Sequence, residues 1–435
     1  MVDERGALIL QGKTGYPSID KRHLWNTKFS LKHPAVSKLS IANHLDFLWH
    51  NSKGDIAIYE NGRFITRGEV LDNSKTIAKA FLELGVYRDN VIFMSLPNSH
   101  QALECFLAAN RIGASIMLVD QDDTLRLIDQ LVGHKPKLYI NFNQDKEFSK
   151  AIIHNTETKV ITLNSMDEDL EDSDIDNIDD NLINYRDLKV IGDRNNSILN
   201  PVNLGDACAL IDPNKSYYYR NSNIQYTCKY INNSVDIKEN NKCLSYLPKL
   251  TTQGFIASVL APVIAGKEMI ISDGITDEDL IVKPDLIMTD ADAIPELYNN
   301  IVETKDLSFV KKIISRSSDT DELSYFSIPL AKVEKISLFG KNVLLGIKRN
   351  VDEESKTKLV NGPKFVILNE YTNEEVKYDE VGRLCVRGKH VMNDNSRTVR
   401  FNDDDYYKTD IKGSIDREGN FVIAEIDEKV KRKER

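Results

Sequence analysis

The stretch LGVYRDNVIFMSLPNSHQALECFLAANRIGASIMLVDQ, residues 84–121, decides the fold. Residues 90–97 are mostly apolar and end at a proline, which is typical of a buried strand. Residues 99–114 place apolar side chains at helical spacing and reach a helix stop at Gly113. A second apolar run follows at 115–120. A strand, a helix and a strand at this spacing predict a parallel sheet covered by helices.

The same alternation continues on both sides of this stretch. A helical pattern covers residues 71–85, and strand and helix patterns alternate through 124–142 and 243–290. After Gly362 the pattern changes to short strands separated by polar turns, which indicates a small antiparallel unit. We therefore predict the α/β class, with two α/β subdomains packed together and a small β subdomain.

Composition limits the classes of function. The 435 residues are 41% hydrophobic and 29% charged, enough for well-buried cores, and the net charge of −10 argues against a nucleic-acid partner. The N-terminus lacks a signal-like apolar segment and no run of 18 apolar residues occurs, so we expect no membrane span and a cytoplasmic location. The odd number and wide spacing of the cysteines predict buried free thiols at Cys105, Cys208, Cys228, Cys243 and Cys385.

An acidic segment at residues 165–187 superficially resembles a calcium loop. Its spacing of Asp172, Asp174 and Asp176 fits the start of such a loop. Asn177 stands where the loop needs glycine, and Ile183 stands where it needs a bidentate glutamate. We therefore predict no metal site and interpret the segment as a solvated linker. The basic C-terminal tail is interpreted as a solvated end in the same way.

Several stretches resemble, in order, the adenylate-forming (AMP-binding) superfamily of acyl-CoA synthetases, luciferases and peptide-synthetase adenylation domains. Within 84–121 they are LGV at a helix end, LPN after a strand and NRIGA at the next helix end. The further matches are TGYPSIDK, SYLPKLTTQGF, VLAPVIAGKEMII, EVGRLCVRGKHVM and YYKTDIKGSIDREGNFVIAEIDEKVK. The resemblance covers most of residues 40–431. Within the superfamily, the sequence resembles the acyl-CoA synthetase branch. It implies the N-terminal region of that fold, with a small subdomain that is β-barrel-like.

The resemblance also implies a chemistry. Members of this family activate a carboxylic acid with ATP, release pyrophosphate and pass the acyl group to a thiol. That reaction needs a flexible loop rich in Gly, Ser and Thr for the phosphates and an acidic residue for magnesium. It also needs an aspartate for the ribose and a lysine on a mobile C-terminal domain. ATP and Mg²⁺ are therefore the expected cofactors only if ligase activity is retained.

The phosphate loop is the first departure from the family pattern. After the apolar run that begins DACALI, the family has a pattern like T-S-G-T-T-G-x-P-K-G, whereas this chain continues DPNKS into YYYRNSNI. The remaining residues are Asn214, Lys215 and Ser216, and no glycine occurs between Gly205 and Gly254. Lys215 would meet a phosphate only as a lone charge. We therefore predict a plain turn here.

The adenine, magnesium and ribose motifs are also degenerate. The Y-G-x-T-E motif aligns with LFGKNVL and leaves Phe339 and Gly340 without the acid. The T-G-D motif aligns with KTDIKGSID, which puts Asp410 at the glycine and Ile411 at the aspartate; a one-residue slip would restore Asp410. A degenerate ATP site would thus consist of Asn214, Lys215, Ser216, Phe339, Gly340 and Asp410.

The hinge and the acyl pocket depart from the family as well. The hinge motif G-R-x-D aligns with AEID, with Glu425 in place of the arginine and Asp427 at the acid. The histidine of the LP-x-x-H motif, beside the acyl pocket, is replaced by Thr251. We expect the substrate pocket to involve Thr251, Thr252 and Gly254, and to prefer an apolar or neutral ligand to a carboxylate. No catalytic residue is assigned.

We expect an N-terminal arm (1–38), paired α/β subdomains (39–360), a small β subdomain (361–423) and a hinge remnant (424–435) without the C-terminal domain. Three interpretations of function stay open. The first is a pseudoenzyme that binds a small apolar or acyl ligand or a catalytic paralogue. The second is an active acyl-CoA or acyl-carrier ligase with altered residues, and the third is a fragment or purely structural protein. The sequence does not identify the ligand, the partner or the oligomeric state.

Overall fold

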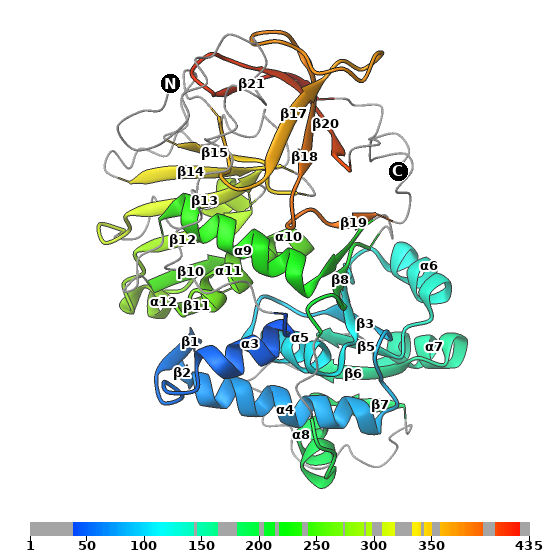
Figure 1. Ribbon diagram of the computed structural model, residues 1–435. Coiled ribbons are helices and arrows are strands. Elements are labelled where there is room, and N and C mark those ends of the chain that lie inside the picture. The colour runs from blue at the N-terminus through cyan, green and yellow to red at the C-terminus, as the bar shows by residue number, and fades with distance from the viewer. Residues whose placement is uncertain are drawn as a thin grey trace.

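The computed structural model describes residues 38–142, 146–163, 181–199, 204–213, 217–236, 242–272, 275–290, 293–297, 307–317, 333–340, 343–349, 357–394 and 405–426. Two large sheets and one small sheet, with helices between and around them, form the molecule (Figure 1). The predicted α/β class, with two mixed α/β units and a small curled β unit, is confirmed. Two predictions concern residues that the structure does not describe. One is on the basic tail, and the other is on the calcium-like residues Asp172, Asp174, Asp176 and Asn177.

The first sheet has eight strands and contains the stretch that decides the fold. Its core is parallel, and β8, β9 and β19 are joined by antiparallel pairings. The strand order is β19 (Asn393–Asp394), β9 (Tyr217–Arg220), β8 (Cys208–Ile211), β4 (Ser115–Leu118), β3 (Val91–Ser95), β5 (Leu138–Phe142), β6 (Lys159–Leu163) and β7 (Leu182–Asn184). Its helices are α4 (Arg67–Glu83), α5 (His100–Ile112) and α8 (Tyr185–Arg194) on the inner face, and α6 (Thr124–His134) and α7 (Lys146–Thr156) on the outer face.

The second sheet has nine strands, and its central strands are parallel. The strand order is β16 (Lys358–Leu359), β15 (Gly346–Arg349), β14 (Glu334–Phe339), β13 (Lys312–Ser317), β12 (Leu286–Asp290), β10 (Lys242–Tyr246), β11 (Glu268–Ser272), β1 (Ile56–Glu60) and β2 (Arg63–Thr66). The inner face packs against α9 (Asn221–Val235), the π-helix η2 (Phe255–Leu260) and α11 (Ala261–Ile264), with α10 (Thr252–Gly254) leading into η2. The outer face packs against α12 (Asp277–Ile281) and α13 (Ile294–Leu297).

The third sheet is small and antiparallel, in the order β17 (Lys364–Leu368), β18 (Gly382–Arg387), β20 (Tyr407–Ile415) and β21 (Phe421–Ile426). Its buried side chains join the core of the two larger sheets. The third sheet is not formed by one uninterrupted segment of the chain. Between β18 and β20 the chain forms β19, which pairs with β9 of the first sheet. The domain boundaries proposed from the sequence stay a prediction.

Local sequence explains why the central helices form where they do. Thr66 and Glu69 make a reciprocal capping box at the start of α4, and the Ser99 hydroxyl accepts from Ala102 N at the start of α5. Gly113 ends α5 in the left-handed conformation, with φ of 76°, as the sequence predicted. α5 is buried on all sides from His100 to Arg111 because it lies between the two large sheets. A short helix α3 (Ile41–Leu48) packs beside it.

The predicted free thiols are confirmed. All five cysteines are free, four of them are buried, and Cys208 is half-buried. Burial raises the pKa of Cys243 and of Cys385 to about 12, so these thiols stay protonated at neutral pH. In the described part of the chain, no helix is both long and apolar enough to cross a bilayer.

A buried carboxyl joins the three inner helices of the first sheet. Glu104 on α5 is fully buried and accepts hydrogen bonds from Asn73 on α4 (2.7 Å) and from the Tyr185 hydroxyl at the start of α8 (3.2 Å). Burial raises the pKa of Glu104, and His100, Lys189 and the two hydrogen bonds oppose that shift only in part. The protonated acid is therefore favoured in the folded protein relative to the unfolded chain.

This shift predicts a pH dependence of stability. Because the folded protein holds the Glu104 proton above the usual carboxyl pKa, the free energy of unfolding should fall as pH rises from about 4.5 toward the raised pKa. Glu104→Gln carries no titrating proton; its amide oxygen can still accept from Asn73, and its N–H can donate to the Tyr185 oxygen. We therefore expect it to remove this decline. Urea unfolding between pH 4.5 and 8 measures the effect. Glu374→Gln, at an exposed position, is the control. If the free energy of unfolding of Glu104→Gln falls with pH as in the parent, Glu104 is not the cause of the decline.

Candidate active-site edge

The second sheet reverses its winding direction at β10. This strand lies between β11 and β12, and its connection to β11 runs over the inner face, whereas the connection from β11 to β12 runs through α12 on the outer face. In doubly wound sheets, ligands bind outside the carboxyl ends of the strands at such a switch point. The residues that follow β10 and end β12 are therefore the candidate site.

Three sequence-predicted pocket residues lie at this point. Thr251 is the N-cap of α10: its hydroxyl accepts from Gly254 N at 2.9 Å and donates to Asp290 Oδ2 at 2.8 Å, at the end of β12. Thr252 is buried, and within the described structure its hydroxyl has no hydrogen-bond partner. A Cβ on Gly254 would lie 2.6 Å from Asp290 Oδ2, so glycine is needed for this close approach. The three residues are held together around a carboxylate.

A buried arginine lies two strands away from β10 on the same edge. Arg316 is 7% exposed near the end of β13, and its Nη2 donates to the carbonyl of Gly340 at 2.8 Å, just beyond β14. Burial lowers the pKa of Arg316, and the nearby Tyr219 and Asp290 oppose the shift. Asp290 and Arg316 pair in the β12–β13 register, so opposite charges stand side by side at the edge.

The first sheet also contributes residues to this edge of the second sheet. The Tyr219 hydroxyl of β9 is hydrogen-bonded by the amide of Gln253 in α10. Burial raises the pKa of Tyr219 well above its ordinary value, so the phenol is protonated at neutral pH. Asn98, in the LPN segment after β3, donates to the carbonyls of Ser245 (2.9 Å) and Ser272 (3.2 Å) in the second sheet. These hydrogen bonds thus join the two sheets at this edge.

Comparison with known proteins agrees with this architecture. The family model described as AMP-binding enzyme matches residues 48–207. A long-chain-fatty-acid-CoA ligase from Archaeoglobus fulgidus matches with a TM-score of 0.73 and 13% identity, over 90% of this chain and 85% of that chain. The family model thus matches part of the chain, and the structural likeness covers most of it.

Two further solved structures are similar at the same level. An anthranilate CoA ligase in complex with anthranoyl-AMP has a TM-score of 0.72 and 12% identity, over 89% of this chain and 77% of that chain. The luciferase-like enzyme of the nonluminescent mealworm Zophobas morio has a TM-score of 0.70 and 14% identity, over 91% of this chain and 97% of that chain. No curated protein matches the chain. At these identities the structural likeness establishes the fold.

The adenylate-forming phosphate loop would lie between β8 and β9. These strands form an antiparallel hairpin, and Asp212 N donates to the Tyr217 carbonyl at 2.9 Å next to the turn. Only residues 213–216 connect this closing pair, and none is a glycine. Asn214, Lys215 and Ser216 themselves lie outside the described residues.

The remaining predicted ATP residues lie on two sheets. Phe339 and Gly340 are at the carboxyl end of β14, and Phe339 packs 6.3 Å from the Phe421 ring of β21. Asp410 is half-buried on β20 and alternates with the buried Thr409 and Ile411, so its side chain leaves the opposite face of that strand. The side chain of Glu425 and all of Asp427 fall outside what the structure describes.

Sequence reasoning missed Asp290 and Arg316. Both follow apolar strand patterns, PDLIMT and KKIIS, at positions where a parallel sheet places its carboxyl edge. The signal was therefore present, as a charged residue that ends each apolar run. What local patterns did not show is that the two strands are neighbours and that the charges meet.

Proposed function

We propose that this chain is a pseudoenzyme of the adenylate-forming superfamily that acts by binding. The proposal rests on the β8–β9 hairpin. Asp212 and Tyr217 are hydrogen-bonded to each other, and the four residues between them include no glycine. A phosphate cradle needs several backbone N–H groups that converge on the anion, and glycine allows that close approach. A turn of this length and composition does not supply such a cradle.

The residues at the edge fit ATP and Mg²⁺ poorly. Asp290, a carboxylate at the switch point, accepts from Thr251 and lies beside Arg316, so its charge is already compensated within the protein. Among the described residues, no group of three His, Cys, Asp or Glu side chains could hold a metal ion.

The same edge suits a neutral ligand. A carboxylate placed here would compete with Asp290 for Arg316, whereas the unsatisfied hydroxyl of Thr252 offers a short polar contact to a neutral ligand. Phe255 and the other apolar residues of η2 supply a buried wall behind them. We propose a small apolar or neutral acyl compound, or a catalytic paralogue at the surface, as the binding partner.

Exchange of labelled pyrophosphate into ATP tests the proposal. With a panel of fatty and aromatic acids we expect no exchange above the enzyme-free blank. The loss of one hydrogen-bond donor that stabilises developing negative charge lowers a reaction rate by about 10²–10³-fold, and several such donors to the phosphates are missing. The fatty-acid ligase from Archaeoglobus fulgidus, assayed in parallel, controls for reagents and acids. Acid-dependent exchange by this chain would overturn the proposal and establish the ligase interpretation.

We also propose a cytoplasmic location. The five free cysteines support it, because disulfides form and persist in oxidising compartments and unpaired thiols are usual in reducing ones. Fractionation of cells that express the full chain measures it: recovery in a secreted fraction would contradict the proposal.

A further inference from the structure

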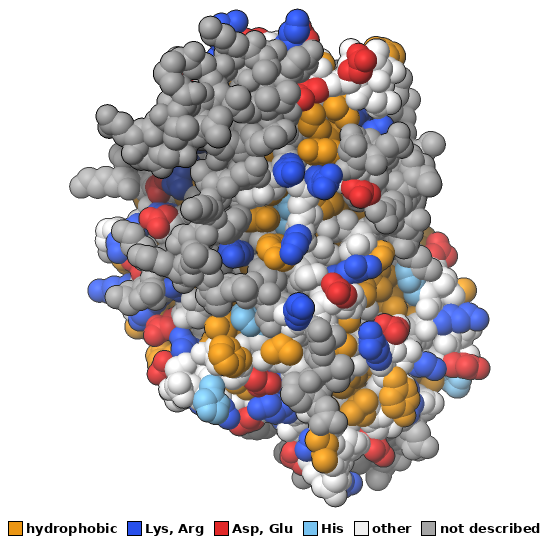
Figure 2. All heavy atoms as spheres, in the orientation of Figure 1, with side chains coloured by type: hydrophobic (Ala, Val, Ile, Leu, Met, Phe, Trp, Pro, Cys, Tyr) orange, Lys and Arg blue, Asp and Glu red, His pale blue; other side chains and the backbone are white. Residues whose placement is uncertain are grey.

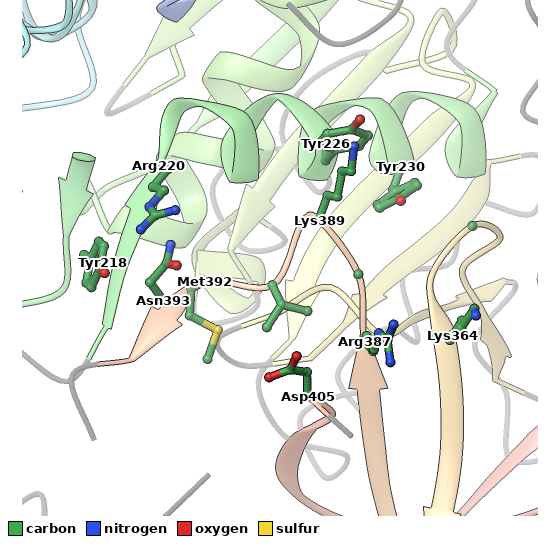
Figure 3. A pocket seen from close by; sticks show the side chains of 13 residues that line it. Tyr218, Arg220, Tyr226, Tyr230, Lys364, Arg387, Lys389, Met392, Asn393 and Asp405 are labelled. Atoms are coloured by element: carbon green, nitrogen blue, oxygen red, sulfur yellow. The ribbon is translucent and has the colours of Figure 1, made fainter. Parts of the chain in front are cut away.

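A cleft lies away from the switch point, where α9, β9, β19 and the third sheet meet (Figure 3). Its volume is about 750 Å³, within the range of pockets for small organic molecules. β9 separates it from the active-site edge: buried Tyr219 bonds Gln253 at that edge, whereas Tyr218 and Arg220, which alternate with it, line the cleft.

The cleft carries positive charge in an acidic protein. Its lining includes four cationic side chains, Arg220, Lys364, Arg387 and Lys389, and one carboxylate, Asp405, whereas the whole chain has a net charge of −10. Figure 2 shows Lys and Arg side chains gathered in the middle of this face of the molecule. Within the described part of the chain, Arg220, Lys364 and Lys389 form no salt bridge.

Two of these cations oppose each other directly. Lys364 on β17 and Arg387 on β18 are register partners in the antiparallel pair. Like charges at directly opposed positions destabilise a sheet. Arg387 also lies 5.9 Å from the centroid of the Tyr406 ring, and an anion between Lys364 and Arg387 would reduce the repulsion.

The walls of the cleft are rigidly held. Asn223 at the start of α9 donates to the carbonyls of Lys389 (2.8 Å) and Val391 (2.9 Å) and accepts from the Asn393 amide (2.8 Å). The segment after β18 is thereby tied to the helix. A site whose polar groups are fixed before binding loses little conformational freedom when a ligand arrives.

The lining also has an aromatic and apolar part. Tyr226 and Tyr230 lie one turn apart on α9 and face the cleft, and the Lys389 ammonium lies 5.3 Å from the Tyr226 ring centroid. Met392 lies opposite them in the same cleft (Figure 3). These side chains would contact the carbon body of a ligand while the cations meet its charges.

We propose that this cleft binds a small organic phosphate with two or more negative charges. Arg220 lies on β9, and the opposed Lys364 and Arg387 lie on β17 and β18, so the two positions are suited to two anionic groups. Arginine forks and lysine ammonium groups form strong charge-assisted hydrogen bonds with phosphate oxygens. The proposal does not depend on what the active-site edge binds.

Calorimetric titration and thermal shifts with fructose 1,6-bisphosphate and phenyl phosphate test the site at low ionic strength, with fructose as the uncharged control. We expect the bisphosphate to bind more tightly than phenyl phosphate, fructose to give no shift, and affinity to fall with added salt. Lys364→Glu should weaken bisphosphate binding by at least about tenfold, because it removes one charge-assisted contact and adds a repulsion.

The same variant separates binding from folding. Lys364→Glu places a carboxylate opposite Arg387, so the ligand-free variant should melt at or above the parent temperature although its phosphate response is lost. Lys377→Glu makes the same charge change at an exposed residue outside the cleft lining and should bind like the parent. No phosphate-dependent shift in the parent, an equal shift with fructose, or unchanged binding by Lys364→Glu would each overturn the proposal.

Discussion

Gly192→Ala should destabilise the protein by at least about 3 kcal/mol, although alanine is the better helix former. Gly192 lies in α8 where it crosses α4. A Cβ built on Gly192 would be 2.0 Å from the Thr76 carbonyl oxygen and 2.7 Å from its carbon. These are backbone atoms of α4, so no rotamer change relieves the overlap and the two helices must move apart. The urea midpoint and slope of unfolding measure the loss.

Gly133→Ala is the matched control for this prediction. Gly133 also lies in a helix, α6, but nothing lies within 4 Å of the position its Cβ would take. There the usual advantage of alanine should apply and stabilise the protein by about 0.4–1 kcal/mol. The two substitutions are chemically identical and should have opposite signs. If both variants unfold at the same urea concentration, the close α4–α8 contact is wrong.

Phe255→Ala and Phe106→Ala should each cost about 3–5 kcal/mol. The two rings are almost fully buried and meet edge to face, with centroids 5.2 Å apart. Phe106 belongs to α5 beside the first sheet and Phe255 to η2 beside the second, so the contact joins the two α/β units. The double variant should lose about 0.5–1.5 kcal/mol less than the sum, because the pair interaction is removed only once.

This cycle also tests whether the two large sheets unfold together. Because the core around the rings is continuous, each single variant should shift one common transition, followed by both circular dichroism and tyrosine fluorescence. Phe47→Ala, at a phenylalanine that is 75% exposed, should change stability by less than about 0.5 kcal/mol. Two separate transitions, of which only one moves in each variant, would contradict the continuous core.

Much of the architecture could be predicted from local sequence. The apolar run 90–97 became β3, the periodic segment 99–114 became α5, and Gly113 ends that helix with a positive φ as predicted. These features follow from contacts between residues a few positions apart, which the helical and strand periods encode directly. The lack of glycine at residues 213–216 is also a sequence property, whereas the turn predicted at Asn214, Lys215 and Ser216 lies outside the described residues and stays a prediction.

The tertiary structure alone decided which distant residues meet. Arg316 reaches Gly340 and neighbours Asp290 because β12, β13 and β14 are adjacent in the sheet order. Cleft residues Arg220 and Lys364 are separated by more than a quarter of the chain and come together only when β19 crosses to pair with β9. Periodicity specifies which face of a helix or strand is buried. It does not specify which other element packs beside it. Sheet order is settled by packing over the whole core, so the position of a charge at a strand end or cleft becomes visible only in the folded chain.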